Sequence, residues 1–159
     1  MQVSMKEKFM AEAIRLAGMN IMNENGGPFG AVVVRSNEII ATGCNRVTET
    51  NDPTAHAEIV AIRNACVALR TFNLSGCEIF CSCEPCPMCL GAILWARIDK
   101  VYFAADQHDA KAAGFDDEHF YEEISLPAED RRLPSEQMMR PEAVKVFHMW
   151  TNSQNRIEY

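Results

Sequence analysis

The sequence predicts an α/β fold, in which helices pack against a partly parallel sheet. Segments with strand character alternate with helical segments of roughly 10–15 residues, which is typical of crossover connections between parallel strands. The chain of 159 residues is 48% hydrophobic and 23% charged, the composition of a globular protein that buries a sizeable core. No repeat, linker or change in composition marks a boundary, so we expect one domain over residues 1–159.

The first third of the chain is expected to form a helix followed by a β-hairpin. Ser4 and Glu7 have the spacing of a capping box, and apolar residues follow at helical intervals. This helix must end near residues 25–28, because Asn-Gly-Gly-Pro is a cluster of strong helix breakers. Two strands joined by a polar turn come next, over residues 29–35 and 39–44.

The remaining segments continue the alternation of helices and strands. Three further helices are predicted from cap residues or prolines at their starts and from apolar periodicity, over residues 52–69, 85–96 and 141–152. Between them lie two strands and an acidic region of short helices and loops, over residues 79–83, 100–105 and 106–123.

The charge of the chain argues against binding to nucleic acid. Its formal net charge is −7, and residues 106–159 hold 12 acidic and 6 basic side chains. Such a surface would not displace counterions from a phosphate backbone. The longest aliphatic stretch, Ala31 to Val34, is far too short to cross a bilayer, and we see no signal peptide at the N-terminus. We expect a cytoplasmic protein with neither nucleic acid nor membrane as a partner.

Seven cysteines in a chain without a secretory segment need a chemical explanation. Five of them fall between Cys77 and Cys89. Because the cytoplasm keeps thiols reduced, clustered cysteines indicate a metal site before a disulfide. Cys86 and Cys89 have a spacing that is common in zinc sites.

The two cysteines are expected at the start of a helix. If Pro87 is the first helical residue, Cys86 is at the cap and Cys89 is in the first turn. Both sulfurs then lie beside unpaired backbone N–H groups and the positive end of the helix dipole, which stabilise thiolates. Thiolates are the form in which cysteine binds zinc.

His56 and Glu58 would meet this cluster if they also begin a helix. Residues two apart in a helix interior point to nearly opposite sides, but a site beyond the helix end can be reached from the cap and from the first turn. We expect His56, Cys86 and Cys89 to hold Zn²⁺, and the vacant fourth position to bind water. Glu58 would be the carboxylate that moves the proton of that water.

Each half of this arrangement has a simpler explanation. A lone histidine in a helix is more often packed or solvated, and a lone Cys-x-x-Cys could be a redox pair, a structural zinc site or chance. Together with Pro85, however, the residues match the pattern H-x-E…P-C-x-x-C of zinc-dependent nucleobase deaminases. A closed site with Cys83 as fourth ligand remains an alternative, although it would leave Glu58 without a role.

Along essentially its whole length the chain resembles the bacterial guanine deaminases of the cytidine-deaminase-like superfamily. The zinc motifs are shared across that superfamily, whereas Gly-Phe-Asp-Asp at 114–117 and the terminal Glu158-Tyr159 point to guanine. The resemblance rests on five segments, residues 26–32, 51–58, 82–92, 114–117 and 158–159.

The resemblance implies a three-layer α/β/α fold around a five-stranded mixed sheet. It also implies one Zn²⁺ per subunit and hydrolysis of guanine at C2 to give xanthine and ammonia. In such enzymes a homodimer forms, and the C-terminal segment crosses over to complete the partner's active site. This chain is therefore expected to swap its C-terminal segment.

The same resemblance assigns residues to a purine pocket. It implies that Phe29 stacks on the base, that the Asn45 amide binds the ring edge and that the backbone N–H of Ala57 binds the carbonyl oxygen. Phe115 belongs to the motif that implies guanine and is assigned to the same pocket. By their sequence alone, Phe29 could be a core residue and Asn45 could simply end a strand.

Three further residues are assigned to the site by the resemblance. Trp95 would form a wall, Asp117 would contact the base and aid a second proton transfer to the leaving amine, and Tyr159 of the other subunit would cover the pocket. From the residues alone, Trp95 could be core, Asp117 could belong to a solvated acidic run, and a terminal tyrosine is ordered only if it docks.

Other functions fit some of these features. A related aminopurine, guanosine or an aminotriazine could be the substrate instead of guanine. A tRNA adenosine deaminase would have the same zinc motifs, but it should gather basic residues near its site, and Arg131-Arg132 is the only basic doublet here. A zinc-stabilised protein without activity would need a fourth protein ligand.

Overall fold

The structure is a computed structural model that describes residues 3–115 and 117–159. Asp116, which belongs to the segment that suggests guanine, lies outside these residues. Two compact units are present, one up to Glu118 and the other His119–Tyr159. The expectation of a single domain over the whole chain remains a prediction.

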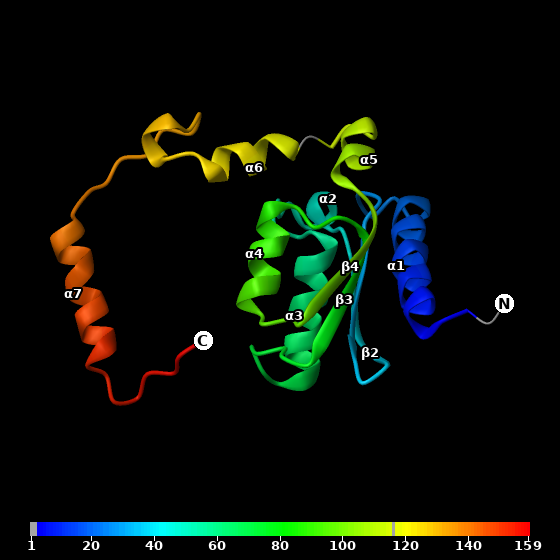
Figure 1. The fold of residues 1–159 in the computed structure, drawn as a ribbon, viewed down its shortest axis with the longest axis horizontal. Helices are drawn as coiled ribbons and strands as arrows, with labels where there is room; N and C mark the ends of the chain where they lie inside the picture. Colours follow the sequence, from blue (N-terminus) through cyan, green and yellow to red (C-terminus); the bar gives the residue numbers. More distant parts are fainter. Residues whose placement is uncertain (1–2, 116) are drawn as a thin grey trace. The chain divides into compact units, whose positions relative to one another are not determined.

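The first unit alternates helices and strands as expected (Figure 1). Its sheet has the order β2-β1-β3-β4, in which β1 runs antiparallel to β2 and β3, and β3 runs parallel to β4. The α/β class and the mixed sheet are therefore confirmed. The elements are α1 (Met5–Met22), β1 (Gly30–Arg35), β2 (Glu38–Cys44), α2 (Val47–Thr50), α3 (Ala57–Leu69), β3 (Cys77–Cys83), α4 (Pro87–Trp95), β4 (Lys100–Ala105) and α5 (Gln107–Ala112).

The expected five-stranded sheet is wrong, because the part of the chain that the structure describes has four strands. These four are the strands that the residue patterns indicated, and the fifth came only from the resemblance. After β4 the chain turns into α5 and continues through helices and loops. Adjacent β-branched residues favour strands, and no two of them adjoin anywhere in residues 106–159.

Helices cover both faces of the sheet and make three layers (Figure 1). Side chains alternate across β1, so that Val32 and Val34 face α1, where they pack with Phe9 and Phe80. The intervening residues of β1 face the other way, into a core shared with α3 and α4. This second core contains Ala31, Val33, Ala57, Ala61, Ile62, Ile79 and Ile93.

Two glycines let helix backbones approach the sheet closely. A Cβ on Gly30 would lie 2.3 Å from the carbonyl oxygen of Ala13, so α1 packs directly against the start of β1. A Cβ on Gly43 would lie 2.3 Å from the oxygen of Ala57 and 2.5 Å from the nitrogen of Ala61. Gly43 therefore fixes the first turn of α3 against β2.

The second unit is helical. It contains α6 (Glu118–Ser125), which begins one residue before the unit, a single 3₁₀ turn (Ala128–Asp130) and α7 (Arg140–Thr151). Within it the backbone N–H of Arg132 donates to both carboxylate oxygens of Glu123, at 3.0 and 3.1 Å. Among the described residues of the whole chain, no helix has the length and apolar character that crossing a membrane requires.

Candidate active site

Two helix N-termini meet at the predicted metal site. His56 is the N-cap of α3 and Cys86 is the N-cap of α4, with Pro87 at the first helical position and Cys89 in the first turn. Proline suits that position because its missing N–H would have no helical partner. Neither cap makes a side-chain hydrogen bond to its own helix, so both side chains remain available to each other.

The three side chains converge within bonding range of one ion. Nδ1 of His56 lies 3.6 Å from Sγ of Cys86 and 3.5 Å from Sγ of Cys89, and all ligand atoms of the three residues lie within 4.8 Å of one another. Tetrahedral Zn²⁺ with its usual bond lengths holds nitrogen and sulfur ligands about 3.6 Å apart. The donor set and its spacing therefore fit zinc.

The pKa values of the two thiols and of His56 depend on one another. A hydrogen bond from Cys89 is the largest cause that lowers the pKa of the Cys86 thiol to about 4, and the His56 imidazole lowers it further. The same pairing with Cys86, together with burial, raises the pKa of Cys89. The hydrogen bond to Cys86 raises the pKa of His56. Without an ion, therefore, the cluster holds protons that a cation would displace.

Glu58 lies beside this cluster, in the first turn of α3, with 8% of its surface exposed. Burial is the largest cause that raises the pKa of its carboxyl, and the charge of the nearby Cys86 thiolate raises it further. A buried carboxyl beside the metal ligands can accept and return a proton, as a general base and acid must.

Cys83 does not join the metal cluster. In the described part of the chain, only His56, Cys86 and Cys89 form a group able to hold an ion. The Cys83 thiol donates instead to the carbonyl oxygen of Asp106 at 3.6 Å, and burial raises its pKa to about 11. This arrangement favours three protein ligands over the closed four-ligand site.

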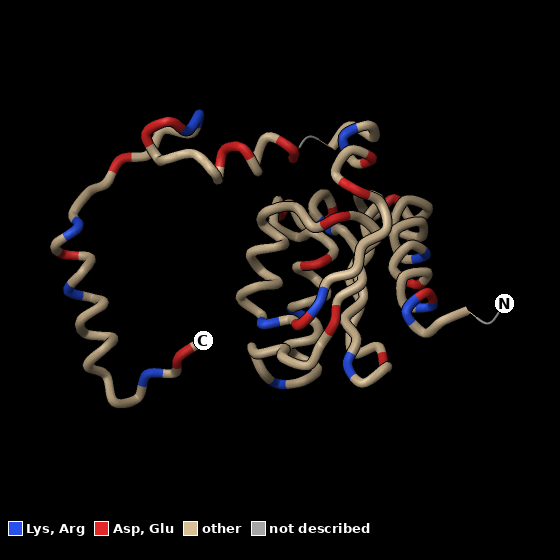
Figure 2. Tube along the Cα trace, viewed as in Figure 1, with Lys and Arg blue, Asp and Glu red and all other residues tan. Residues whose placement is uncertain are grey.

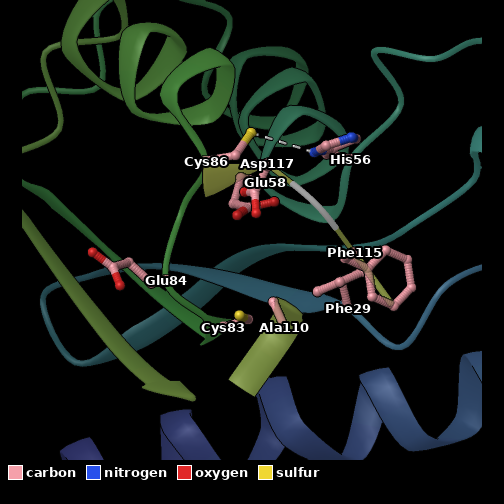
Figure 3. A pocket seen from close by; sticks show the side chains of 9 residues that line it. All are labelled: Phe29, His56, Glu58, Cys83, Glu84, Cys86, Ala110, Phe115 and Asp117. Atoms are coloured by element: carbon pink, nitrogen blue, oxygen red, sulfur yellow. Dashed lines mark hydrogen bonds between the residues drawn. The ribbon is translucent and has the colours of Figure 1, made fainter. Parts of the chain in front are cut away.

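A pocket of about 340 Å³, part of it open to solvent, lies next to the cluster (Figure 3). In Figure 3 the rings of Phe29 and Phe115 lie at one end of the pocket, with their centroids 4.8 Å apart and their planes at 77°. The lining residues are Phe29, His56, Glu58, Cys83, Glu84, Cys86, Ala110, Phe115 and Asp117.

The site and the sheet are those of a known protein family. Residues 3–105 match the family described as the cytidine and deoxycytidylate deaminase zinc-binding region. The chain belongs to this deaminase family. The matched region includes α3, α4 and all four strands of the sheet.

Individual proteins resemble longer parts of the chain. It is 50% identical over 153 residues, 96% of its length, to a guanine deaminase of Bacillus subtilis, of which the match covers 98%. The crystal structure of a guanine deaminase from Bacillus subtilis superimposes with a TM-score of 0.93, over 96% of this chain and 98% of that one.

Two more distant relatives match a shorter part of the chain. A tRNA-specific adenosine deaminase of Aquifex aeolicus is 45% identical over 100 residues, 63% of this chain and 66% of the relative. A structure of the guanine deaminase from Nitrosomonas europaea, 38% identical, gives a TM-score of 0.66 over 69% of this chain and 64% of that one. The superfamily resemblance read from the sequence is confirmed.

Several of the residues that were expected to bind the base lie at the pocket or next to a residue that lines it. Phe29, Phe115 and Asp117 line it, and Asp117 is close enough to His56 to contribute to the rise of its pKa. Ala57 is the first residue of α3, so its N–H is among those that a helix leaves without an internal partner. Asn45 is buried, and its side-chain oxygen accepts from the backbone N–H groups of Gly27 and Val47.

Trp95 is not among the residues that line the pocket, and the structure does not test the place of Tyr159. Trp95 is the last residue of α4, about 12 Å along the helix from Pro87, and its side chain is 63% exposed. The structure of a single chain therefore does not make it a pocket wall. Tyr159 belongs to the second unit, where it is 72% exposed. Its place over a pocket stays a prediction.

Two lining residues were not predicted. Glu84 precedes Pro85 in the cysteine motif, and its carboxylate accepts from the backbone N–H of Gln107 at 3.2 Å. Its position within the cysteine motif was the one sequence feature that could have indicated a place at the site. Ala110 comes from α5, a helix that brings the chain back over the site, and a single alanine in an acidic segment gives no sequence signal.

Proposed function

We propose that the protein hydrolyses guanine to xanthine and ammonia. The observation that supports this most is the 50% identity to a guanine deaminase over 96% of the chain, with a matching fold. That similarity extends past residue 105, where the zinc-binding region of the family ends. It therefore includes Phe115 and Asp117, which line the pocket together with the metal cluster.

One Zn²⁺ per subunit would be held by His56, Cys86 and Cys89. Bound zinc supplies a water molecule that ionises near neutral pH, with a pKa of about 7. In this chain both cysteines lie at the positive end of α4, and the imidazole completes a donor set with spacing that suits zinc.

Glu58 would move the protons of the reaction. As general base it accepts the proton of the attacking water, and as general acid it gives that proton to the ring nitrogen beside C2. The oxygen adds to C2, and the C2–N bond to the amine then breaks to release ammonia. Asp117, on the same pocket, would take the proton of the new C2 hydroxyl and deliver it to the leaving amine, which leaves the C2 carbonyl of xanthine.

The remaining pocket groups would bind the base. Phe29 offers a ring face on which a purine can stack. The ring of Phe115 packs against that of Phe29 in a T-shaped arrangement. The N–H of Ala57 would donate to the carbonyl oxygen of guanine. The Asn45 amide would contact the edge of the ring.

The working form would be a homodimer in which the C-terminal segment of a second copy, ending in Tyr159, covers the pocket. Apolar side chains exposed on a single chain support this, because a stable partner would bury them. On α4 they are Leu90, Leu94 and Trp95, and in the second unit Phe120, Ile124, Val146, Phe147 and Trp150. We propose a cytoplasmic location, in which the seven free thiols stay reduced.

A tRNA adenosine deaminase is the second candidate, because a tRNA-specific adenosine deaminase of Aquifex aeolicus is 45% identical over 63% of this chain. Among the nine lining residues that the structure describes, three are carboxylates and none is Lys or Arg. In Figure 2 the Lys and Arg residues of the described chain are interspersed with Asp and Glu. An RNA backbone needs a basic surface, so these features favour a free purine.

A side-by-side assay tests the proposal. Purified protein is incubated with guanine, guanosine, 2,6-diaminopurine, adenine, cytosine and a tRNA anticodon stem-loop, and released ammonia is measured. Turnover should be fastest with guanine. A preference for the stem-loop, or no ammonia from guanine, would refute the proposal, and a preference for guanosine or another aminopurine would correct the substrate.

A further inference from the structure

A buried asparagine on α1 binds two loops at once. Asn20 is 4% exposed, although it is polar and far from the metal cluster in sequence. Its amide nitrogen donates to the carbonyl oxygen of Gly27 at 2.8 Å and to that of Asn45 at 2.9 Å. Both hydrogens of the amide are therefore used, each on a backbone oxygen of a different loop.

The packing of α1 fixes where this side chain lies. At Gly30 the backbone of α1 comes so close that a Cβ there would lie 2.3 Å from the Ala13 oxygen and 2.8 Å from the Ala17 nitrogen, so this part of α1 packs directly on the sheet. Asn20 follows Ala17 by three residues and so lies one turn further on the same helix face. That face is buried at Ala13, Ala17 and Asn20.

The two oxygens that Asn20 binds belong to the segments that hold Phe29 and Asn45. The N–H of Phe29 donates to the Gly27 oxygen at 2.8 Å, and the N–H of Asn45 donates to the Phe29 oxygen at 3.1 Å. The Asn45 side chain returns to the loop by accepting from the Gly27 N–H at 3.3 Å. These bonds form a closed network with Asn20 as its one member from α1.

The loop that contains Gly26 and Gly27 is tightly packed. A Cβ on Gly26 would lie 2.5 Å from the Asn45 oxygen, and one on Gly27 would lie 3.2 Å from the Phe29 ring. The loop thus packs directly on both residues. A change in the position of the Gly27 or Asn45 carbonyl would move the Phe29 ring, which lines the pocket.

We propose that Asn20 is a positioning residue for base recognition, which sets Phe29 and Asn45 in place by binding the Gly27 and Asn45 carbonyls. This inference rests on the proposed function, because it takes the pocket to bind a purine. Asn20 does not contact the metal cluster, so it acts on binding of the base and leaves the proton transfer by Glu58 unchanged.

Two substitutions remove the donors without changing the size of the side chain much. In Asn20→Asp a carboxylate would face two carbonyl oxygens, and in Asn20→Leu the two oxygens would lose their partners without a buried charge. The matched control is Asn64→Asp. Asn64 also donates from a helix to a backbone oxygen, that of Thr42, at 2.9 Å, but it is exposed and belongs to no part of the pocket.

The experiment measures kcat and KM for guanine, zinc content, and hydrogen exchange of the peptide that spans residues 24–31. For both Asn20 variants we expect KM to rise by about tenfold or more, kcat to stay within about threefold, zinc content to be unchanged, and exchange in the peptide to accelerate. The control should match the wild type in all four. The assay is run well below the melting temperature of each variant, so that lost stability alone would not raise KM.

The outcomes separate this inference from the proposed function. Suppose that the wild type turns over guanine. If the Asn20 variants then have the wild-type KM, or if their kcat falls while KM changes little, Asn20 does not position the base. If the wild type releases no ammonia from guanine, the proposed function fails, and the exchange measurement still decides whether Asn20 holds the loop. Unchanged exchange in a folded Asn20→Leu variant would overturn the inference in either case.

Discussion

Nδ1 of His56 lies 3.5 Å from Sγ of Cys89, although the two residues are 33 positions apart in the chain. They are brought together because α3 and α4 lie on the same face of the sheet with their N-termini at one end. The two helices therefore provide the ligands and, through their dipoles, the environment that favours thiolates. Glu58 occupies the first turn of the same helix that His56 caps.

Replacing Glu58 with glutamine should abolish turnover and leave the zinc in place. Glutamine has nearly the same shape, but it cannot accept the proton, so kcat should fall by about 10²–10⁴-fold. Zinc content and ammonia release are measured on the same sample. Glu49→Gln, at an exposed ion pair with Arg46, is the control and should leave kcat unchanged. Retained activity in Glu58→Gln would mean that another group moves the proton.

Replacing Cys86 with serine should release the metal, whereas replacing Cys83 should not. The two residues line the same pocket, but only Cys86 belongs to the ligand cluster. A serine hydroxyl is a poor ligand for zinc compared with a thiolate. Zinc per chain is measured after dialysis against a weak chelator. Loss of zinc from Cys83→Ser at the same rate as from Cys86→Ser would favour the four-ligand site.

Replacing Gly43 with alanine should destabilise the protein and impair the site. The new methyl would lie 2.3 Å from the Ala57 oxygen and would push α3 away from β2. Overpacking of this kind lowers the free energy of unfolding by about 1–3 kcal/mol. Denaturant unfolding measures the change. Gly18→Ala is the control, because a Cβ there meets nothing within 4 Å, and it should stabilise α1 by about 0.5–1 kcal/mol.

Deleting Tyr159 should lower activity without unfolding the protein. If the C-terminal segment of a second copy covers the pocket, the missing ring would leave the base more exposed to water and raise KM. The melting temperature should stay close to that of the wild type, since Tyr159 belongs to none of the core clusters of the described residues. Tyr159→Phe, which keeps the ring, shows whether the hydroxyl is needed. Kinetics identical to the wild type after the deletion would exclude the tail from the site.

The local signals in the sequence predicted the elements well. The capping box is present, since Ser4 Oγ accepts from the N–H of Glu7 and the Glu7 carboxylate accepts from the N–H of Ser4. The turn at Ser36-Asn37 joins β1 and β2, with positive φ at both residues, as the expected hairpin requires. Pro87 opens α4. Each of these features depends on a few neighbouring residues, which is why a single sequence is enough to predict them.

Features that depend on contacts between distant segments could not be predicted in this way. The apolar spacing of α4 left open whether Trp95 was core or pocket wall, and it is neither in a single chain, because it ends the helix on an exposed side. A lone asparagine gave no sign that Asn20 would bind two loops across the fold. The fifth strand came from analogy and not from any run of strand-forming residues.

The proposed chemistry depends most on the number and kind of ligands around the metal. X-ray absorption at the zinc edge of the native protein measures both. We predict one zinc per chain with two sulfur neighbours at about 2.3 Å and two lighter neighbours, nitrogen and oxygen, at about 2.0–2.2 Å. Three sulfur neighbours, or protein that is fully folded with no zinc, would contradict it.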